Sequence, residues 1–211
     1  MGLSGLRQEY QKHRLSKKNM SHDPFVQFKK WFDEAVESEI DMVNAMTLAT
    51  ATKGGTPSAR IVLLKEFNER GFVFFTHFGS RKGVELSENP GAALILFWKE
   101  LERQIRIEGT VEKISTGESD RYFKTRPDES KVSAIISEQS KVVPNRKYLE
   151  KLWEGKLRKS QAEELKRPVS WGGYRVKPNR IEFWQGRPNR LNDRFLYEKE
   201  GDNWVLSRLA P

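Results

Sequence analysis

From residue 45 onward the chain alternates short apolar runs with turns, and this pattern limits its possible folds more than any other feature. The runs AMTLATAT, SARIVLLK, GFVFFTHF, GAALILFW and QIRIEGTVEKI have strand length and are rich in β-branched and aromatic residues. Glycine and charge clusters such as KGGTP and FNERG separate them. The pattern returns in WGGYRVKPNRIEFWQG and DRFLYEKEGDNWVLSRLAP. Strands joined by short turns favour antiparallel pairing, so we expect a mainly β fold, an antiparallel sheet or barrel.

Helices are predicted around this sheet. The segment HDPFVQFKKWFDEAVES predicts a helix capped by Asp23, with Pro24 in its first turn and one face formed by Phe25, Phe28, Phe32 and Ala35. Shorter helices are predicted in SRKGVELSENP, in ESKVSAIISEQS and in STGESDRYFKTRP, where Ser115 or Thr116 is the cap. The charged segment NRKYLEKLWEGKLRKSQAEELK predicts a long helix.

The domain organisation follows from what surrounds these elements. Residues 1–22 are polar and basic, and we expect them to form a mobile N-terminal arm. No internal repeat or long linker divides residues 23–211, so we expect one domain with helices flanking the sheet. No apolar run approaches the roughly 18–20 residues of a membrane span, and no signal peptide is recognisable, so we expect a cytoplasmic protein without membrane association. The basic composition of residues 1–22 leaves a transit peptide as an alternative, although the stretch is not clearly amphipathic.

The composition excludes several kinds of chemistry. The chain has no cysteine, which removes disulfides, zinc thiolates, thiol nucleophiles and iron–sulfur clusters. Its three histidines, His13, His22 and His77, are widely spaced, so neither a metal site nor a serine–histidine hydrolase is expected. The net charge of +9 favours an anionic partner, but it does not separate nucleic acid from small phosphorylated ligands.

Several segments are candidates for anion binding. Arg60 and Lys65 lie at the two ends of an apolar strand, although surface cations would have the same pattern. In GSRKG, Arg81 and Lys82 open a helix, where backbone N–H groups favour phosphate, and a solvated basic turn is an equal alternative. Tyr122 and Arg126 share a helix face. Ser130 begins the next helix, so hydroxyl groups and a guanidinium can together bind a second phosphate, while Gln139 and Ser140 offer polar groups to a heterocycle.

The segment WQGRPNRLNDRF places Arg187, Arg190 and Arg194 between Trp184 and Phe195. Taken alone, it fits either a solvated charged turn or a site for a flat anionic ligand.

Taken in order, these segments resemble the pyridoxine (pyridoxamine) 5′-phosphate oxidase family over nearly the whole chain. The resemblance rests on LRQEY, RIVLLK, FFTHFGSRKG, LERQIRIEG, YFKTRP, SEQS, WGGYRV, IEFWQG with NRLNDR, and the terminal RLAP. It implies an FMN-binding split β-barrel that forms a homodimer with flavin at the subunit interface. Such enzymes oxidise pyridoxamine or pyridoxine 5′-phosphate to pyridoxal 5′-phosphate, with hydride transfer to FMN and reoxidation by O2 to give H2O2.

The resemblance also implies residue roles. FMN would contact Arg60, Ile61, Val62, Leu63, Leu64, Lys65, Phe75, Thr76, Arg81, Lys82, Gln104, Gln139, Ser140, Trp184 and Arg194. The substrate phosphate would contact Lys65, Tyr122, Arg126 and Ser130, while Arg190 and Asn192 would lie over the substrate ring as catalytic residues. Arg7 and Tyr10 resemble an arm segment that closes over the site. Arg187 has no role in the motif and reads as a surface charge, and Phe195 reads as core.

The chain departs from the family pattern at one position. The family has histidine where this chain has Asn192 in RLNDR. Asparagine donates and accepts hydrogen bonds but does not titrate near neutral pH. If the histidine is needed only for a hydrogen bond, Asn192 can replace it; if it is an obligatory proton carrier, this chain is impaired.

Two other classes of function compete with the oxidase. One is an FMN enzyme with a different substrate, which the substrate-phosphate set argues against. The other is a non-enzymatic binder of pyridoxal phosphate or flavin, or a basic nucleic-acid protein, since aromatic and cationic side chains also hold single strands. The order of the motifs argues against nucleic acid, and flavin absorbance with peroxide release would separate the three classes.

Overall fold

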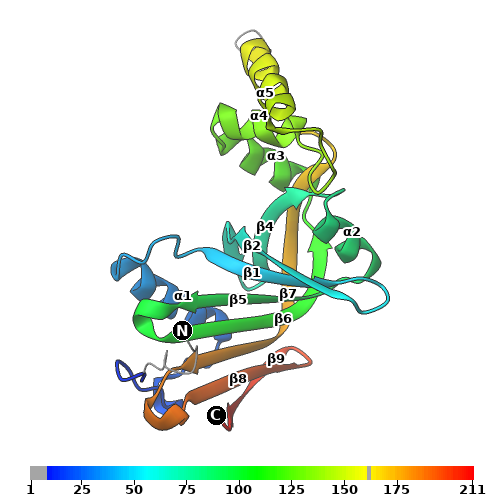
Figure 1. The fold of residues 1–211 in the computed structure, drawn as a ribbon. Coiled ribbons are helices and arrows are strands. Elements are labelled where there is room, and N and C mark those ends of the chain that lie inside the picture. The colour runs from blue at the N-terminus through cyan, green and yellow to red at the C-terminus, as the bar shows by residue number, and fades with distance from the viewer. Residues whose placement is uncertain (1–8, 161–162) are drawn as a thin grey trace.

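The computed structural model describes residues 9–160 and 163–211. Its nine strands form one curled, fully antiparallel sheet with helices around it (Figure 1). The strands are β1 (Ala45–Ala51), β2 (Pro57–Leu63), β3 (Glu66–Asn68), β4 (Gly71–His77), β5 (Gly91–Trp98), β6 (Arg103–Lys113), β7 (Trp171–Gln185), β8 (Asp193–Glu200) and β9 (Asn203–Leu209). The fold is mainly β with the curled half-barrel of split-barrel proteins, which confirms the predicted fold class.

The sheet order is β2-β1-β5-β6-β7-β4-β3, and β8 and β9 extend it from β7. β7 is long enough to pair with β4 through its first half and with β8 through its second half. Its pairing with β6 shifts register between Glu108 and Gly109. A Cβ on Gly109 would lie 2.1 Å from the Lys177 carbonyl oxygen, so only glycine permits this close approach of the two strands.

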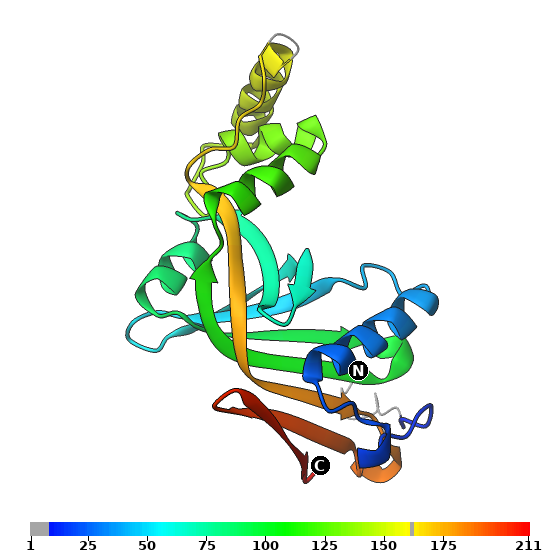
Figure 2. The same cartoon turned by 180° about the vertical axis from the view of Figure 1, so that it is seen from behind.

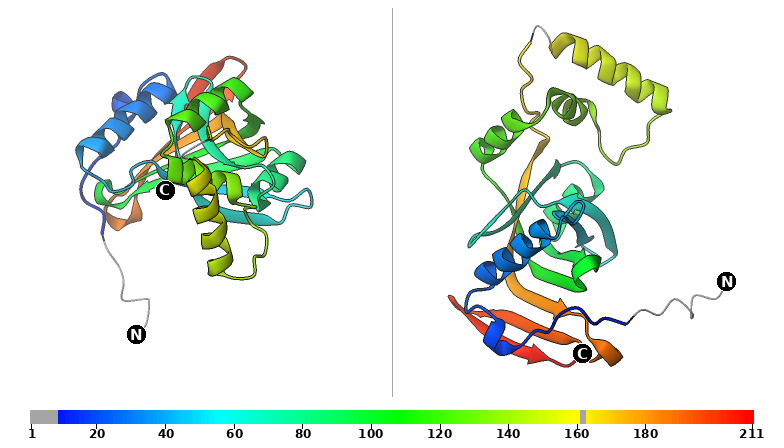
Figure 3. Two further views of the ribbon diagram at one scale, coloured as in Figure 1. Left: turned by 90° about the horizontal axis from the view of Figure 1, so that it is seen from above. Right: turned by 90° about the vertical axis from the view of Figure 1, so that its left-hand side faces the viewer.

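The helices are α1 (Pro24–Glu37), α2 (Arg81–Glu88), α3 (Thr116–Thr125), α4 (Asp128–Ile136) and α5 (Arg146–Ser160). Short 3-10 turns are η2 (Lys17–Asn19), η3 (Lys99–Leu101) and η4 (Pro188–Arg190). Helices α3 to α5 gather at one end of the sheet, whereas β8 and β9 lie at the opposite end (Figures 1 and 2). Figure 3 shows α5 beyond α4, away from the sheet, and no residue of α5 is buried.

The main core lies between α1 and the sheet. The Asp23 carboxylate accepts from the Phe25 and Val26 N–H groups and caps α1, as predicted. The ring of Phe28 packs edge-on against Phe72, with centroids 4.9 Å apart. Trp31 packs in the same way on Phe183, at 5.1 Å. The amphipathic spacing of α1 therefore buries its apolar side chains against the sheet.

Most predicted elements form with small shifts in their ends. The predicted helix over 145–166 ends at Ser160, and the predicted helix over 129–140 ends at Ile136. The FNERG segment, predicted as a turn, includes the end of the three-residue strand β3. Within the described residues, no helix is long and apolar enough to cross a membrane.

Candidate active site

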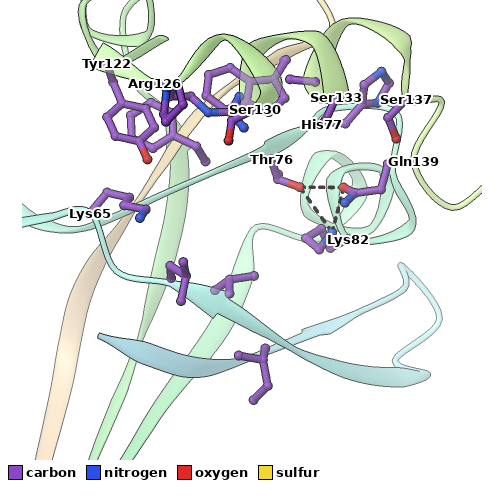
Figure 4. Close-up of a pocket in the computed structure, with 17 residues that line it drawn as sticks. Lys65, Thr76, His77, Lys82, Tyr122, Arg126, Ser130, Ser133, Ser137 and Gln139 are labelled. Atoms are coloured by element: carbon purple, nitrogen blue, oxygen red, sulfur yellow. Dashed lines mark hydrogen bonds between the residues drawn. The ribbon is translucent and has the colours of Figure 1, made fainter. Parts of the chain in front are cut away.

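A pocket of about 570 Å³ opens between the sheet and helices α3 and α4 (Figure 4). Strands β2 and β4 form one side, and α3, α4 and the segment after α4 form the other. Its volume suits a small-molecule site. Among the predicted FMN contacts, the pocket is lined by Ile61, Val62, Leu63, Lys65, Phe75, Thr76, Lys82 and Gln139. All four predicted substrate-phosphate residues also line it, namely Lys65, Tyr122, Arg126 and Ser130.

The pocket is cationic. Among the described residues that line it, none is aspartate or glutamate, whereas Lys65, Lys82 and Arg126 carry positive charge. Figure 4 shows Lys65, Arg126 and Ser130 near one end and Lys82 near the other. The two ends can therefore each attract an anionic group.

At one end, Arg126 has a donor without an acceptor. Its guanidinium lies over the Trp171 ring, with Cζ 4.7 Å from the centroid. Its buried Nη1 has no hydrogen-bond partner in the described part of the chain. Burial lowers the pKa of Arg126, and nearby Tyr122 raises it by less. Because buried donors are normally paired, this one fits an anionic ligand such as a phosphate.

Helix α3 positions this end. Ser115 and Glu118 form a capping box at its start, and Arg126 is its C-cap residue. The Tyr122 ring stacks on Phe75 with centroids 3.9 Å apart. Tyr122 is in the last turn of α3, four residues before Arg126, so both belong to the C-terminal end of this helix. The aromatic rings of Phe75 and Tyr122 therefore line the end of the pocket that contains Arg126.

At the other end, Lys82, Thr76 and Gln139 form a closed triangle of hydrogen bonds (Figure 4). Lys82 Nζ donates to Gln139 Oε1 at 3.1 Å and to Thr76 Oγ1 at 3.2 Å. Burial lowers the pKa of Lys82, as does the charge of Arg60, while Glu85 raises it. The ammonium is held by neutral oxygen atoms, so its charge remains available to a ligand.

Arg60, Arg81 and Ser140 adjoin this end without lining the pocket. The Arg81 N–H donates to Ser140 Oγ at 3.1 Å, and Ser140 has a left-handed backbone with φ 74°. Arg60 Nη1 donates to the Leu48 carbonyl oxygen at 3.3 Å. Leu64 differs from its neighbours because the residue is 4% exposed and belongs to the core. The Leu64 side chain does not line the pocket, so it does not provide the expected FMN contact.

Gln104, Trp184 and Arg194 form a second cluster on β6, β7 and β8. Gln104 lies opposite Trp184, and Trp184 lies opposite Arg194, so the three are cross-strand neighbours. Arg194 Nε donates to Glu182 Oε1 at 2.6 Å, and this hydrogen bond raises the pKa of Arg194. Gln104 is near the start of β6 and Trp184 near the end of β7, whereas α3 follows the opposite end of β6, and none of the three residues lines the pocket.

The loop between β7 and β8 carries Arg190 and Asn192 beside this second cluster. Asn189 and Arg190 both have left-handed backbones, with φ 59° and 61°. Such conformations are unusual for non-glycine residues and cluster at functional sites. Asn192 Oδ1 accepts from the Arg187 N–H at 3.0 Å and closes the loop.

The Arg187 side chain is 22% exposed, and it also connects the loop to the N-terminal arm and to Asp193. Its Nη1 donates to the His13 carbonyl oxygen at 3.2 Å, and its Nε lies 3.5 Å from Asp193 Oδ2. Phe195 is 1% exposed, which confirms its assignment to the core.

The described part of the N-terminal arm lies against the second cluster. The Tyr10 ring meets Trp184 edge-on, with centroids 5.5 Å apart. Glu102 Oε2 accepts from the Gln11 and Lys12 N–H groups at 2.9 and 3.0 Å. Arg7 lies outside the described residues. The contacts describe a docked segment, and mobility of residues 1–22 stays a prediction.

The pocket also contains residues that sequence reasoning missed. Ser133, Ala134 and Ser137 on α4 and its C-cap continue the face that Ser130 begins, a helical spacing that the sequence could have revealed. Trp171 was recognised only as part of WGGYRV. The buried carboxylate of Glu85 was missed, although it lies four residues after Arg81.

Two family models match this chain. The model described as pyridoxamine 5′-phosphate oxidase matches residues 32–154. The model described as the pyridoxine 5′-phosphate oxidase C-terminal dimerisation region matches residues 171–211. Together they cover the pocket strands, α3, α4 and the second cluster.

Similar proteins agree with these models. Pyridoxine/pyridoxamine 5′-phosphate oxidases from Gloeothece citriformis and Salinibacter ruber are 51% and 52% identical. Each alignment covers 99% of this chain, with 98% and 99% of the relatives. The structure of PhzG from Burkholderia lata, solved with tetrahydrophenazine-1-carboxylic acid, is 31% identical with a TM-score of 0.87, covering 92% of this chain and 95% of that one.

A more distant structure supports the fold alone. An FMN-binding protein from Nostoc punctiforme is 16% identical with a TM-score of 0.71, covering 91% of this chain and all of that one. The family models and the full-length relatives establish that this chain belongs to the pyridoxine/pyridoxamine 5′-phosphate oxidase family.

Proposed function

We propose that this protein is an FMN-dependent oxidase that converts pyridoxamine or pyridoxine 5′-phosphate to pyridoxal 5′-phosphate. When bound, FMN would supply the redox chemistry, as acceptor of a hydride and with reoxidation by O2 to H2O2. The chain itself binds and orients the two phosphorylated molecules and keeps water from the reacting atoms.

The observation that carries the proposal is the buried Nη1 of Arg126, which has no partner among the described residues, in a pocket to which those residues contribute no acidic side chain. A guanidinium there favours a phosphate monoester, with Lys65 adding charge and Tyr122 and Ser130 adding hydroxyl groups. This end of the pocket is assigned to the substrate phosphate. The stacked rings of Phe75 and Tyr122 border it with a flat apolar wall.

The other end is assigned to FMN. Lys82 offers a partly buried charge, and Arg60 and Arg81 lie beside it. The strand residues Ile61, Val62 and Leu63 present backbone and apolar groups between the two ends. Residues at both ends therefore fit a ligand pair with two phosphate groups and a flat ring system.

A second copy of the chain completes the site in this proposal. Gln104, Trp184 and Arg194 carry predicted flavin contacts but belong to the cluster on β6, β7 and β8, not to the pocket. In a homodimer, the cluster of one protomer can face the pocket of its partner. The match of residues 171–211 to a dimerisation region supports this arrangement. Arg190 and Asn192 would then close over the substrate from the partner's side.

Spectra and turnover test the proposal together. The purified protein should show flavin absorbance, and adding pyridoxamine 5′-phosphate under air should release H2O2 in step with pyridoxal 5′-phosphate. Flavin without turnover of either vitamer phosphate would identify an FMN enzyme with another substrate. A protein that binds no flavin would overturn the cofactor assignment and favour the non-enzymatic alternatives.

A further inference from the structure

Glu85 is a buried carboxylate where β1, β2 and α2 meet. Its residue is 3% exposed. Glu85 Oε1 accepts from Arg81 Nε at 2.8 Å, and Oε2 accepts from Ser58 Oγ at 2.6 Å and from Arg60 Nη2 at 3.3 Å. The Thr50 hydroxyl also donates to Oε2. One side chain therefore joins two arginines that approach the Lys82 end of the pocket.

The local sequence places these groups together. Ser58 and Arg60 alternate along β2 and so share a face, and Thr50 lies opposite Ser58 in the β1–β2 register. The Ser80 side chain caps α2, and Arg81 and Glu85 lie four residues apart on it. A Cβ on Gly83 would lie 2.2 Å from the Phe78 carbonyl oxygen, so glycine lets α2 sit against the end of β4. Helix α2 thus places the Glu85 carboxylate in contact with the guanidinium groups of Arg60 and Arg81.

Packing alone does not explain a charge at this position. Burial raises the pKa of Glu85, but hydrogen bonds from Ser58, Thr50, Arg81 and Arg60 outweigh burial and lower it to about 2. The carboxylate is therefore ionised at neutral pH. A buried ion pair is weak evidence for stability, because an apolar replacement of similar volume often serves as well. Its value lies in fixing the geometry of its partners.

The geometry points to Glu85 as a positioning residue that holds the guanidinium groups of Arg60 and Arg81 for the phosphate of the flavin cofactor. This inference rests on the proposed function, since it deepens the assignment of that end of the pocket to FMN. Glu85 does not contact the phosphate. It acts by fixing one arginine that is mostly buried and one that is 60% exposed and otherwise free to rotate.

Two effects of removing the charge oppose each other. Losing the carboxylate makes the site more positive, which favours an anion at long range. It also leaves Arg60, Arg81 and Lys82 repelling one another without a counter-charge, and it frees the exposed Arg81 side chain. Water and salt screen exposed charges, so the gain in long-range attraction for the FMN phosphate is small. Hydrogen bonds act at contact distance, so the loss of the fixed arginine geometry weakens FMN binding more than the added positive charge strengthens it.

The experiment compares FMN with riboflavin, which has the same ring but no phosphate. Apoprotein is titrated with each flavin, and binding is followed by flavin fluorescence. In Glu85→Gln, the Kd for FMN should rise about tenfold, or about 1.4 kcal/mol, while the Kd for riboflavin stays unchanged. Glu88→Gln is the matched control, because Glu88 is an exposed residue of the same helix. It should leave both constants unchanged.

A double-mutant cycle guards against misfolding. Arg81→Gln alone should reproduce the FMN-specific loss, and Glu85→Gln combined with Arg81→Gln should lose less than the sum of the two single changes. Equal weakening of FMN and riboflavin, or additive losses, would overturn the positioning role in favour of a structural one. If the wild type itself does not prefer FMN over riboflavin, the cofactor assignment fails instead.

Discussion

At the scale of single residues, Arg126 offers a direct test of substrate recognition, because its buried Nη1 has no acceptor within residues 9–160 and 163–211. A charge-assisted contact to the substrate phosphate is worth about 1.5–3 kcal/mol. Arg126→Ala should therefore raise the KM for pyridoxamine 5′-phosphate roughly 10–150-fold, with flavin still bound. Steady-state kinetics and flavin absorbance measure both effects.

The control for this change is Arg121→Ala, which removes an exposed arginine from the same helix. It should leave KM unchanged. Loss of flavin from the Arg126→Ala variant with an unchanged KM would mean that the two phosphate assignments are reversed.

Asn192 tests whether the usual histidine is chemically required. Its Oδ1 holds the Arg187 N–H and so shapes the loop that carries Arg190. Hydrogen bonding of this kind does not need a titratable group, so we expect Asn192→His to change kcat/KM by less than about tenfold. Arg190→Ala should lower kcat/KM more than Asn192→His does, because it removes the charged contact that Arg190 is expected to make with the substrate. Kinetics of the wild type and both variants across pH 6–9 provide the comparison.

One outcome would contradict the proposal that Asn192 can replace the histidine. An inactive, FMN-loaded wild type that gains several orders of magnitude in turnover on Asn192→His would show that the histidine carries a proton. The chain would then be a ligand-binding relative of the oxidases.

At the scale of elements, the sequence predicted most helices and strands because their signals are local. Asp23 caps α1, Ser115 caps α3, and alternating apolar residues mark the long strands. The short strand β3 was missed because three residues are too few for a period. Likewise, no local signal shows that Trp184 lies on a cluster separate from Lys82; only the path of β7 through the sheet decides it.

The N-terminal arm gives a prediction at this scale. Glu102 has a left-handed backbone with φ 53° and accepts two hydrogen bonds from the arm backbone. Glu102→Ala should free the arm and speed trypsin cleavage after Lys12 and Arg14. Cleavage followed by mass spectrometry measures the rate.

Glu100→Ala is the control for the arm, since only the Glu100 backbone carbonyl contacts Lys12. Deleting residues 1–12 removes Tyr10 from Trp184 and should change kcat or KM. Unchanged cleavage in Glu102→Ala would contradict the anchoring role, and unchanged kinetics in the deletion variant would contradict closure over the site.

At the scale of the whole molecule, acid stability follows from two carboxylates. For Glu85, burial raises the pKa, but hydrogen bonds, first from Ser58, bring it to about 2. For Glu118, hydrogen bonds from Ser115, and then from Arg175, lower the pKa to about 2. Their ordinary value is 4.5. Because the unfolded chain binds protons first, the free energy of unfolding should fall as the pH drops from about 4.5 to about 2.

Chemical denaturation at a series of pH values measures this slope. Glu85→Gln should make it shallower, whereas Glu88→Gln should not. An unchanged slope in Glu85→Gln would show that Glu85 does not contribute through its ionisation.

In the proposed dimer, the active site is built from the pocket of one protomer and the second cluster of its partner. Arg126→Ala disables the pocket, and Arg190→Ala disables the loop beside the second cluster. Each variant alone should have low activity at low substrate concentration. If the site spans two chains, mixing the variants and allowing subunits to exchange creates dimers that have one intact site.

Activity of the equimolar mixture at low pyridoxamine 5′-phosphate is therefore the decisive measurement. With random exchange, half of all dimers contain one protomer of each variant. Each such dimer has one intact site and one site that carries both changes. One quarter of all sites is then intact, so we expect recovery of about a quarter of wild-type activity. A mixture that shows only the average of the two parent variants after confirmed exchange would contradict a shared site and place all of these residues in one chain's own pocket.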